Sequence, residues 1–513
     1  MSLLRRKQLV LICMIAFFVL TLFTSSAGAA AEEPSNQKIR VGLCYGSDAS
    51  SSYTFTTKSD GYEYGYSTGK EFIKTGETSE KTIKVTSSGN YKVTLTNGDG
   101  ETITTYKNSS EGNFAFQPKN DGLSYVKYPS GDDLNYDFYG FMEFMHTSST
   151  SKTMMLINVL DFELYCKCVL PCELSASYPM EALKALSVCV RTLATADYTQ
   201  ERHGKNIGFN VCNTTDCQAY YGNSRREVEK NRIITDAAVD ATRGQVMIYT
   251  GEGKGNGKTI QSIYFGSSGG STVSASAQWG STSMPYCAAV RVPEETSYPV
   301  WGATLTLDDI YKVTKSSDFN SSTSWKKAIY SLGKIKSMEI IETEENSDHV
   351  YKLRLTDVDG NSYTITRGDR VYYFIHRLVK SQTKNISSTN FTLTALDPYS
   401  TNIGVMTSEG EEIISSANEI SVITGSGEEK TYKLGTSTTV LTENGKQDVS
   451  LTSSSGYRVS GKGYSHGVGL SQKGASDMAK NYGYDYETIL HRFYTDVAIT
   501  TLEDLELILP INH

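Results

Sequence analysis

Apolar and polar residues alternate along several long stretches of this chain, and this period of two constrains its fold more than any other feature. The side chains that alternate near the start are Ile39, Val41, Leu43 and Tyr45. Such alternation is typical of a strand with one buried face, and it flanks the turn Asn97–Gly98, which favours a hairpin. The 513 residues include 43 Gly but only 10 Pro, which suits many tight turns. We therefore predict an α+β fold that is predominantly β.

One segment shows the helical period instead. Apolar side chains recur there at steps of three and four residues, at Leu183, Leu186, Val190 and Leu193. Such a stripe is typical of a helix with one buried face. Ser177 is a candidate N-cap, and Pro179 suits the first turn, where its missing N–H costs nothing. The sequence thus predicts a helix over 177–198 that packs on a sheet and forms one wall of a groove.

The first residues have the pattern of an export signal. Arg5, Arg6 and Lys7 precede an apolar run over 9–23, and small residues follow. Residues 1–31 are therefore expected to be a signal peptide or a retained N-terminal anchor. On either interpretation the rest of the chain acts outside the cytoplasm.

The charge balance excludes some partners. Without residues 1–31, which carry three basic and no acidic side chains, the chain has 46 Lys and Arg against 57 Asp and Glu, a net charge of −11. A strongly acidic exported protein does not bind nucleic acid or an anionic membrane surface through bulk electrostatics. Membrane contact is therefore expected only through an N-terminal anchor. A polar, weakly charged polymer such as a glycan is easier to accommodate.

The chain divides into parts by pattern and motif. Residues 37–150 are expected to form a β-rich accessory module, in which the sequence offers no paired acids, histidine cluster or phosphate loop. Residues 151–505 contain the segments with candidate chemistry. Within them, 303–455 is an elaborated β-rich part, with a hairpin predicted around the turn Asp359–Gly360.

Three segments carry residues suited to chemistry. They are Tyr165–Thr192, Tyr264–Thr272 and the glycine-rich Gly461–Ala475. In order and spacing they resemble the stage II sporulation protein D family, which includes the amidase-enhancer proteins of bacterial cell walls. The third segment is the most specific, although Ser465 stands where the family string usually has Gly. The resemblance covers roughly residues 155–505.

Membership of this family implies a peptidoglycan lytic transglycosylase that works with one glutamate, and the family motif places that residue at Glu173. Apolar neighbours, on what we expect to be the end of a strand, would desolvate this carboxyl and raise its pKa, so that a proton stays available for a general acid. Glu181 is the competing candidate. Because the helix dipole alone favours a carboxylate in a first turn, we assign stability to Glu181 and catalysis to Glu173.

The resemblance also implies a substrate and a partner. The bond cleaved would join MurNAc to GlcNAc in glycan strands whose stem peptides an amidase has removed, leaving 1,6-anhydro-MurNAc ends. A cell-wall amidase is then the expected partner. The alternative is a non-catalytic protein that binds glycan and enhances an amidase. Both interpretations place the protein in the cell wall or at the outer face of the cytoplasmic membrane, and they differ in whether Glu173 delivers a proton.

Other side chains of the three segments are candidates for substrate binding, because hydroxyl, amide and charged groups suit sugar hydroxyls and acetamido groups. They are Arg191, Tyr264, Ser268, His466, Ser471 and Gln472. For Arg191 an ion pair with a carboxylate is an equal alternative. For His466 the alternative is a buried imidazole that ties its loop to the core.

A further group of residues suggests a metal site. Cys212 and Cys217, with Asp216 between them and His203 nearby, are similar to a stretch that holds zinc beside the groove in some family members. Two thiolates, a carboxylate and an imidazole complete a tetrahedral set. A disulfide or two free thiols are the alternatives. The reaction itself requires no cofactor.

Overall fold

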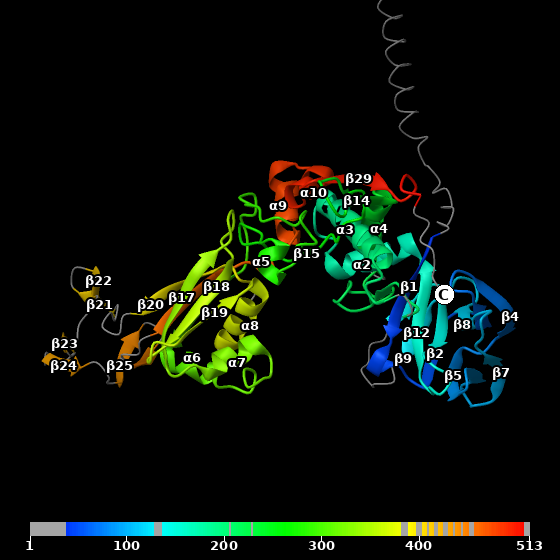
Figure 1. Cartoon of the computed structure of the whole chain (residues 1–513), viewed down its shortest axis with the longest axis horizontal. Coiled ribbons are helices and arrows are strands. Elements are labelled where there is room, and N and C mark those ends of the chain that lie inside the picture. Colours follow the sequence, from blue (N-terminus) through cyan, green and yellow to red (C-terminus); the bar gives the residue numbers. More distant parts are fainter. Residues whose placement is uncertain are drawn as a thin grey trace, which may run out of the picture.

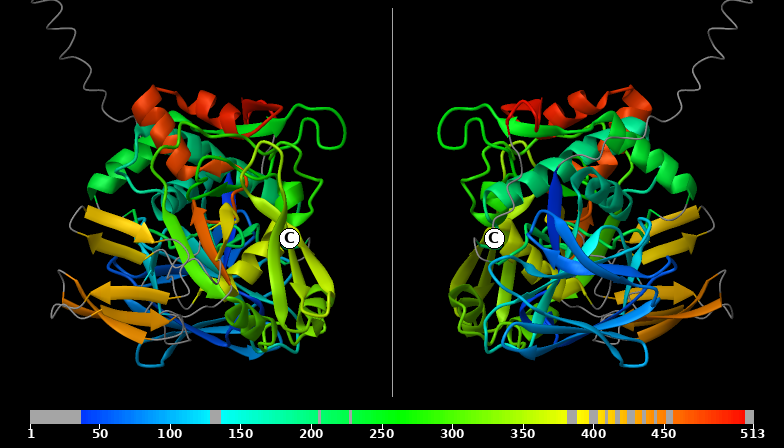
Figure 2. Two further views of the ribbon diagram at one scale, coloured as in Figure 1. Left: turned by 90° about the vertical axis from the view of Figure 1, so that its left-hand side faces the viewer. Right: turned by 90° about the vertical axis from the view of Figure 1, so that its right-hand side faces the viewer.

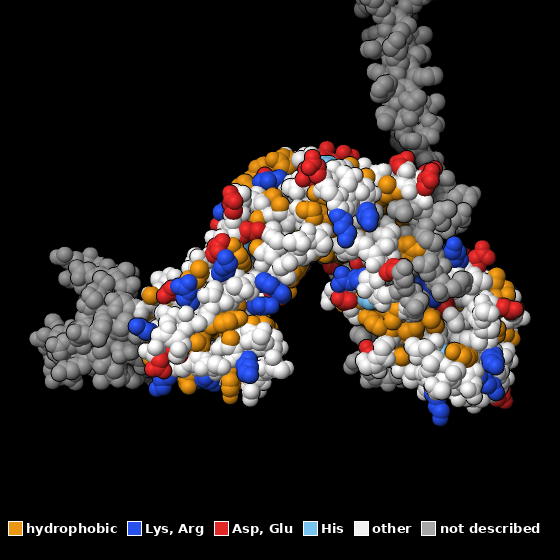
Figure 3. Space-filling view, viewed as in Figure 1, with side chains coloured by type: hydrophobic (Ala, Val, Ile, Leu, Met, Phe, Trp, Pro, Cys, Tyr) orange, Lys and Arg blue, Asp and Glu red, His pale blue; other side chains and the backbone are white. Residues whose placement is uncertain are grey.

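The chain folds into an arch (Figure 1). The computed structural model describes residues 37–127, 136–204, 207–226, 229–380, 388–396 and 456–506, together with the backbone of six strands between 403 and 450. An N-terminal lobe and a second lobe hang from a central body that holds most of the helices. A broad hollow separates the two lobes in the space-filling view (Figure 3). More residues lie in strands than in helices, which confirms the predicted α+β, predominantly β class.

The predicted signal peptide or anchor, residues 1–31, lies outside the described residues. Among the helices that the structure describes, none combines the length and the apolar character of a membrane span.

Two β-sheets build the N-terminal lobe. Their strands are β1 (Lys38–Cys44), β2 (Ser52–Thr56), β3 (Tyr62–Ser67), β4 (Phe72–Thr78), β5 (Thr82–Gly89), β6 (Lys92–Asn97), β7 (Thr102–Lys107), β8 (Asn113–Pro118), β9 (Ser124–Lys127), β10 (Tyr136–Phe138), β11 (Phe141–His146), β12 (Met154–Asp161) and β13 (Val211–Cys212). One sheet has the order β13-β1-β12-β11-β8-β3-β4 and the other β10-β9-β2-β5-β6-β7. The hairpin predicted at Asn97–Gly98 joins β6 to β7.

An aromatic core holds these two sheets together. Phe55 on β2 meets Phe116 on β8 edge-on, with 4.7 Å between the ring centres, and Phe144 on β11 packs against both rings. All three side chains are fully buried, so they contribute apolar burial as well as favourable ring geometry. Strand β12 belongs to the sheet that contains β8 and β11, and the chain continues from it directly into the central body. The N-terminal lobe and the central body therefore share one hydrophobic core.

The central body consists mainly of helices. Its elements are α2 (Phe162–Glu173), α3 (Met180–Thr199), α4 (Glu229–Ala241), β14 (Gln245–Tyr249), β15 (Tyr264–Phe265), α5 (Ala275–Trp279), β28 (Leu470–Ser471), α9 (Gln472–Tyr482), α10 (Tyr486–Phe493) and β29 (Val497–Thr501). Helix α3 is buried along most of its length and packs against α2, α4, α9, α10 and β14. The side views show α9 and α10, in orange and red, along the top of the arch (Figure 2).

The segment before Glu173 is a helix, so the predicted strand end is wrong. Asp161, the last residue of β12, caps α2 by accepting the N–H of Leu164 at 2.9 Å. This cap starts the helix directly at the end of the strand. Pro171 lies near the C-terminus of α2, and Glu173 is the last helical residue.

The central helix begins later than predicted. Helix α3 starts at Met180, and its N-cap is Pro179, which makes no side-chain cap bond. Ser177 does not cap it, because the Ser177 hydroxyl lies 3.1 Å from that of Ser175 in a turn closed by the Tyr178 N–H and the Ser175 carbonyl. The rest of the predicted helix, with its buried stripe, is confirmed.

The second lobe lies between two halves of the central body in the sequence. Its elements are β16 (Val300–Thr306), α6 (Leu307–Thr314), α7 (Ser324–Ser331), β17 (Ile335–Thr343), β18 (Val350–Asp357), β19 (Ser362–Thr366), α8 (Gly368–Val379), β20 (Phe391–Leu396), three hairpins and β27 (Gly456–Lys462). The hairpins are β21 (Ile403–Thr407) with β22 (Gly410–Ile414), β23 (Glu419–Ile423) with β24 (Glu429–Lys433), and β25 (Ser437–Thr442) with β26 (Gly445–Ser450). The lobe has its own core, and the hairpin predicted at Asp359–Gly360 is β18–β19.

Candidate active site

An open pocket of about 1320 Å³ lies in the central body and collects residues that are far apart in the sequence. The ends of α2 and α3, the loop after β13, the loop between β14 and β15, the loop after α5 and the stretch before α9 all contribute to its walls. The side chains most relevant to chemistry are Glu173, Gln218, Tyr264, Trp279, His466 and Gln472. The structure therefore brings the predicted acid together with three of its predicted substrate-binding partners.

Parallel pairing of two very short strands explains how the second and third sequence segments meet. Strand β15 pairs with β28, with Tyr264 opposite Leu470 and Phe265 opposite Ser471. A further antiparallel bridge joins Ser267 to Tyr464. These contacts place Tyr264 and the glycine-rich segment on the same wall of the pocket.

Glu173 is half-buried at the C-terminal end of α2. Its Oε1 accepts the backbone N–H of Ala219 at 3.0 Å, and its carbonyl accepts the side-chain amide of Gln472 at 3.2 Å. Burial raises the pKa of the Glu173 carboxyl, while the Ala219 N–H and the Tyr264 hydroxyl partly offset that rise. The negative end of the α2 dipole acts in the same direction as burial. These effects favour retention of a proton on Glu173.

Tyr264 and Gln218 form the polar lining beside this carboxyl. The Tyr264 hydroxyl donates to Gln218 Oε1 at 3.2 Å, and the Gln218 amide donates to the Val190 carbonyl at 3.2 Å. Gln218 is 1% exposed, so its position is set by α3. Sequence reasoning missed Gln218, and its only local signal was that it follows Cys217 directly.

His466 faces the pocket from the glycine-rich segment. Its ring lies 5.3 Å from that of Trp279 and 5.5 Å from that of Phe265, measured between centres, and its Nδ1 accepts the N–H of Val468 at 3.1 Å. Burial lowers the pKa of His466 to about 4. The imidazole is therefore neutral near pH 7, and because Nδ1 is an acceptor, Nε2 carries the proton and acts as a donor.

Ser465 adopts the backbone conformation that the family's usual glycine would favour. Its φ is 82°, in a region that costs a non-glycine residue on the order of 1 kcal/mol or more. The substitution therefore leaves the turn of the loop in place and adds strain next to His466.

Arg191 is not a substrate-binding residue. The guanidinium is 0% exposed and forms two hydrogen bonds with the carboxylate of Glu163, at 2.7 and 2.8 Å. It also donates to the carbonyls of Gln245 and Val239. The ion-pair alternative for Arg191 is thus the one that the structure supports, because every donor direction points into the core.

Ser268 and Ser471 are also removed from the set of substrate-binding residues. Both are fully buried, and both hydroxyls donate to the carboxylate of Glu295. Ser471 in addition caps α9 by accepting the Gly474 N–H at 3.0 Å. Their hydroxyls take part in a buried hydrogen-bond network that links the second sequence segment to the third. Glu295 lies outside the three segments and gave no signal in the sequence.

Glu181 has the structural contacts expected of it. Its Oε1 accepts the ammonium of Lys184 at 2.7 Å, and its Oε2 accepts the backbone N–H of Tyr486 at 3.0 Å. The first turn of α3 is thereby tied to the start of α10. Glu181 does not line the pocket.

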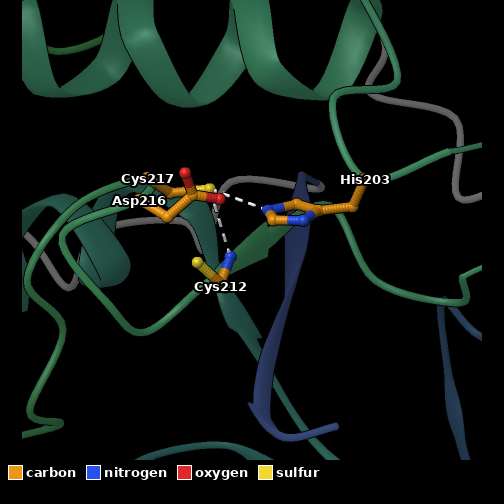
Figure 4. A group of neighbouring side chains, drawn as sticks. All are labelled: His203, Cys212, Asp216 and Cys217. Atoms are coloured by element: carbon orange, nitrogen blue, oxygen red, sulfur yellow. Dashed lines mark hydrogen bonds between the residues drawn. The ribbon is translucent and has the colours of Figure 1, made fainter. Parts of the chain in front are cut away.

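The four candidate metal ligands meet at one edge of the pocket (Figure 4). Cys212, Cys217, His203 and Asp216 each offer a donor atom, and these atoms lie within 4.8 Å of one another. His203 Nε2 is 3.0 Å from Cys217 Sγ. Hydrogen bonds from Cys217 and His203 lower the pKa of the Cys212 thiol. The eight cysteines among the described residues form no disulfide.

Local structure explains why these ligands converge. Strand β13 pairs with β1 and fixes Cys212, and a turn closed by the Cys217 N–H and the Thr214 carbonyl brings Cys217 back toward it. Asp216 is exposed and pairs with Arg202 at 2.9 Å. Two sulfurs, one imidazole nitrogen and one carboxylate form a donor set that suits tetrahedral zinc.

Comparison with known proteins agrees with this arrangement. Residues 150–249 match the family model described as stage II sporulation protein. The chain is 31% identical over 348 residues to the amidase enhancer of Bacillus subtilis (strain 168), an alignment that covers 65% of this chain and 40% of that protein. It is 36% identical over 154 residues to an uncharacterised protein of Brachyspira hyodysenteriae, covering 30% of this chain and 37% of that protein.

The matched regions contain the structural features described above. The family match begins just before β12 and extends through α2, α3, the cysteine pair and β14, so it includes Glu173 and all four candidate metal ligands. The chain spans well under half the length of the two curated relatives. Residues 150–249 are thus similar to the stage II sporulation protein domain, and the longer alignment makes the chain similar to the amidase enhancer.

Proposed function

We propose that this protein is an exported peptidoglycan lytic transglycosylase in which Glu173 is the general acid and base. The observation that carries the proposal is a half-buried carboxyl with a raised pKa in an open pocket of about 1320 Å³, within the domain that matches the family. A carboxyl that keeps its proton in a polymer-sized pocket is suited to protonate a glycosidic oxygen.

The proposed reaction uses one carboxyl twice. Because Oε1 accepts the Ala219 N–H, the acid proton is placed on Oε2, from which it transfers to the oxygen that joins MurNAc C1 to GlcNAc. The C1–O bond breaks. Glu173, now a carboxylate, accepts the proton of the MurNAc C6 hydroxyl as that oxygen bonds to C1 and closes the 1,6-anhydro ring. The nucleophile belongs to the substrate, so proximity replaces a second acid.

The state of Asp216, the other carboxylate that lines the pocket, supports a reaction that uses Glu173 alone. Asp216 is the only additional Asp or Glu among the described lining residues, and it is held by Arg202. Glycosidases that hydrolyse their substrate divide the work between two carboxyl groups on either side of the bond. A single free carboxyl therefore favours the intramolecular route.

The remaining lining residues suit a sugar polymer. Tyr464 is 52% exposed at the pocket, and Trp279 lies beside His466, so two aromatic faces are available for the apolar faces of sugar rings. Neutral His466 lies on the same wall of the pocket as Tyr264. Tyr264 and Gln218 hold the wall next to Glu173 in position.

We further propose that His203, Cys212, Asp216 and Cys217 hold a zinc ion with a structural role. The cluster ends two residues before Ala219, whose N–H contacts Glu173. Bound zinc would supply a fixed crosslink between β13 and the turn after it. In this chain, the residues from Cys217 to Ala219 then hold the amide that fixes the orientation of the Glu173 carboxyl.

The enzyme proposal is tested by digestion of peptide-stripped glycan strands and mass spectrometry of the products. Wild-type protein is expected to release fragments with 1,6-anhydro-MurNAc ends, and Glu173→Gln is expected to release none while it retains the wild-type circular dichroism. Glu181→Gln is the matched control, because this carboxyl lies outside the pocket. Loss of cleavage in Glu181→Gln with activity retained in Glu173→Gln would contradict the assignment.

A second candidate function rests on the similarity to an amidase enhancer. In that case the pocket binds glycan without cleaving it, and the protein increases the activity of a cell-wall amidase, which is its expected partner on either interpretation. The protein would act in the cell wall or at the outer face of the cytoplasmic membrane. Release of stem peptides by an amidase that rises equally with wild type and Glu173→Gln, without anhydro products from either, would support this function instead.

A further inference from the structure

The loop between β14 and β15 carries two lysines to the pocket of Glu173. Lys254 and Lys258 both line this pocket, and both are exposed. Within the part of the chain that the structure describes, neither ammonium group has an ion-pair partner. Glu252 belongs to the same loop but does not line the pocket.

The loop is held by its own backbone. The Tyr249 N–H donates to the Lys258 carbonyl at 2.9 Å, and the Gly257 N–H donates to the Tyr249 carbonyl at 2.7 Å. The Asn256 side chain donates to the carbonyls of Thr250 and Gly251 at 3.1 and 2.9 Å. These bonds fold the loop back on itself, so the two lysines are presented from a defined structure at the end of a strand.

The pocket carries excess positive charge in a protein that is acidic. Three basic side chains line it, Arg202, Lys254 and Lys258, against two acidic ones, Glu173 and Asp216. Asp216 pairs with Arg202 at 2.9 Å, and burial raises the pKa of Glu173. The described lining is therefore formally positive even with Glu173 ionised, although the chain has a formal net charge of −8. Such a site favours a ligand that carries an anionic group.

We propose that Lys254 and Lys258 form a carboxylate-binding subsite for the lactyl group of N-acetylmuramic acid. This inference rests on the proposed function and names what the site recognises. In a peptide-stripped strand each lactyl group ends in a free carboxylate, whereas a stem peptide converts the same carbon into a neutral amide. An ammonium group forms a charge-assisted hydrogen bond with the carboxylate but not with the amide. The two lysines thus distinguish stripped strands from peptide-bearing ones.

The test measures binding in the Glu173→Gln background, so that cleavage does not interfere. Two ligands are compared by isothermal titration calorimetry: peptide-free glycan strands, and the same strands with their lactyl carboxylates converted to methylamides. The subsite predicts roughly tenfold weaker binding of the methylamide strands, the combined effect of two exposed ion pairs. Adding Lys254→Gln and Lys258→Gln is expected to weaken binding of the carboxylate strands by the same factor and to leave the methylamide strands unchanged.

A control and the salt dependence sharpen this test. Lys84→Gln with Lys107→Gln removes the same charge from exposed strands of the N-terminal lobe and is expected to leave both affinities unchanged. High salt is expected to reduce the difference between the two ligands, since exposed charges are screened.

The outcomes separate the two proposals. Equal affinity for both ligands, or an equal loss for both ligands in the lysine variant, overturns the carboxylate subsite. Lysine-dependent preference for the carboxylate strands supports it, even where the wild-type protein releases no anhydro ends and the enzyme proposal fails.

Discussion

The backbone N–H of Ala219 donates to Oε1 of Glu173 at 3.0 Å, and this bond links the cysteine cluster to the candidate acid. Ala219 is two residues from Cys217, so any change in the turn that holds Cys217 moves the donor that orients the carboxyl. The bond lowers the pKa of Glu173, whereas burial raises it by more. The balance of these two effects sets the protonation state on which the proposed chemistry depends.

The first prediction concerns stability as a function of pH. Because burial raises the pKa of Glu173 in the folded state, this carboxyl contributes stability that is fully present below its unfolded pKa and is lost as pH rises through the folded pKa. Glu173→Gln lacks this titration. The Tm of the variant minus that of wild type is therefore expected to increase between pH 4 and pH 8. Scanning calorimetry measures it, and Glu80→Gln, at an exposed site, is the control. A constant difference would contradict the raised pKa.

The pH dependence of cleavage follows from the same carboxyl. The acid form of Glu173 is needed to protonate the leaving oxygen, so kcat/KM is expected to fall as pH rises through its raised pKa. The midpoint of this alkaline limb should lie above about 4.3, the ordinary value for glutamate. Initial rates on peptide-stripped strands measure it. A limb at the ordinary glutamate value would show that Glu173 is not desolvated in the free enzyme.

Another prediction tests the buried network around Glu295. This carboxylate is 2% exposed and accepts hydrogen bonds from the hydroxyls of Ser267, Ser268 and Ser471. Glu295→Gln turns an N–H₂ group toward these donors, so we expect a loss of about 2 kcal/mol or more in the free energy of unfolding, together with weaker cleavage as β15 and β28 separate. Urea denaturation measures the loss.

The neighbouring carboxyl provides the control for this network. Glu294 is also buried, and among the described residues its carboxylate is reached only by Arg492, at 3.4 Å. Glu294→Gln is expected to cost less than Glu295→Gln. An equal cost for the two substitutions would show that the serine network contributes little.

Much of the fold was predictable because its signals are local. Alternation predicted the hairpins β6–β7 and β18–β19, and a stripe of apolar residues predicted most of α3. The segment before Glu173 was different. Its cysteines and apolar residues are buried on all sides of α2, and a helix buried all round has no periodic pattern to detect. Its real signal was Asp161 at the N-cap, directly after a strand.

The candidate site was predictable only in part. The resemblance of three segments to a known motif predicted four residues that line one pocket. They are Glu173, Tyr264, His466 and Gln472. Motif membership did not separate residues that face the pocket from Ser268 and Ser471, which face the core. That separation depends on Glu295, a partner that becomes adjacent only when the chain folds. Lys254 and Lys258 lie outside the motif segments and needed the structure as well.

A further prediction concerns the buried pair of Arg191 and Glu163. Arg191→Met leaves the Glu163 carboxylate buried without its partner, which is expected to cost about 3–5 kcal/mol. Thermal unfolding measures the loss. Combining it with Glu163→Met removes the stranded charge and should recover part of that stability. Lys74→Met, which breaks only exposed pairs with Glu63 and Glu77, is the control and should cause a small change. A double variant less stable than Arg191→Met would contradict this account.

The last prediction concerns the metal. Protein purified without chelator is expected to contain one zinc per chain by elemental analysis, because four donor atoms lie within 4.8 Å of one another. Cys212→Ser and Cys217→Ser should each lose the metal and lower Tm by several degrees, since a ligand that binds only the folded state stabilises it. Cys172→Ser, half-buried and outside the cluster, should keep the metal.

Chelation of the wild type should also shift the alkaline limb of cleavage, because the Ala219 donor to Glu173 is released. Absence of zinc, with a mass 2 Da below that of the reduced chain, would identify a Cys212–Cys217 disulfide instead and would refute the metal site.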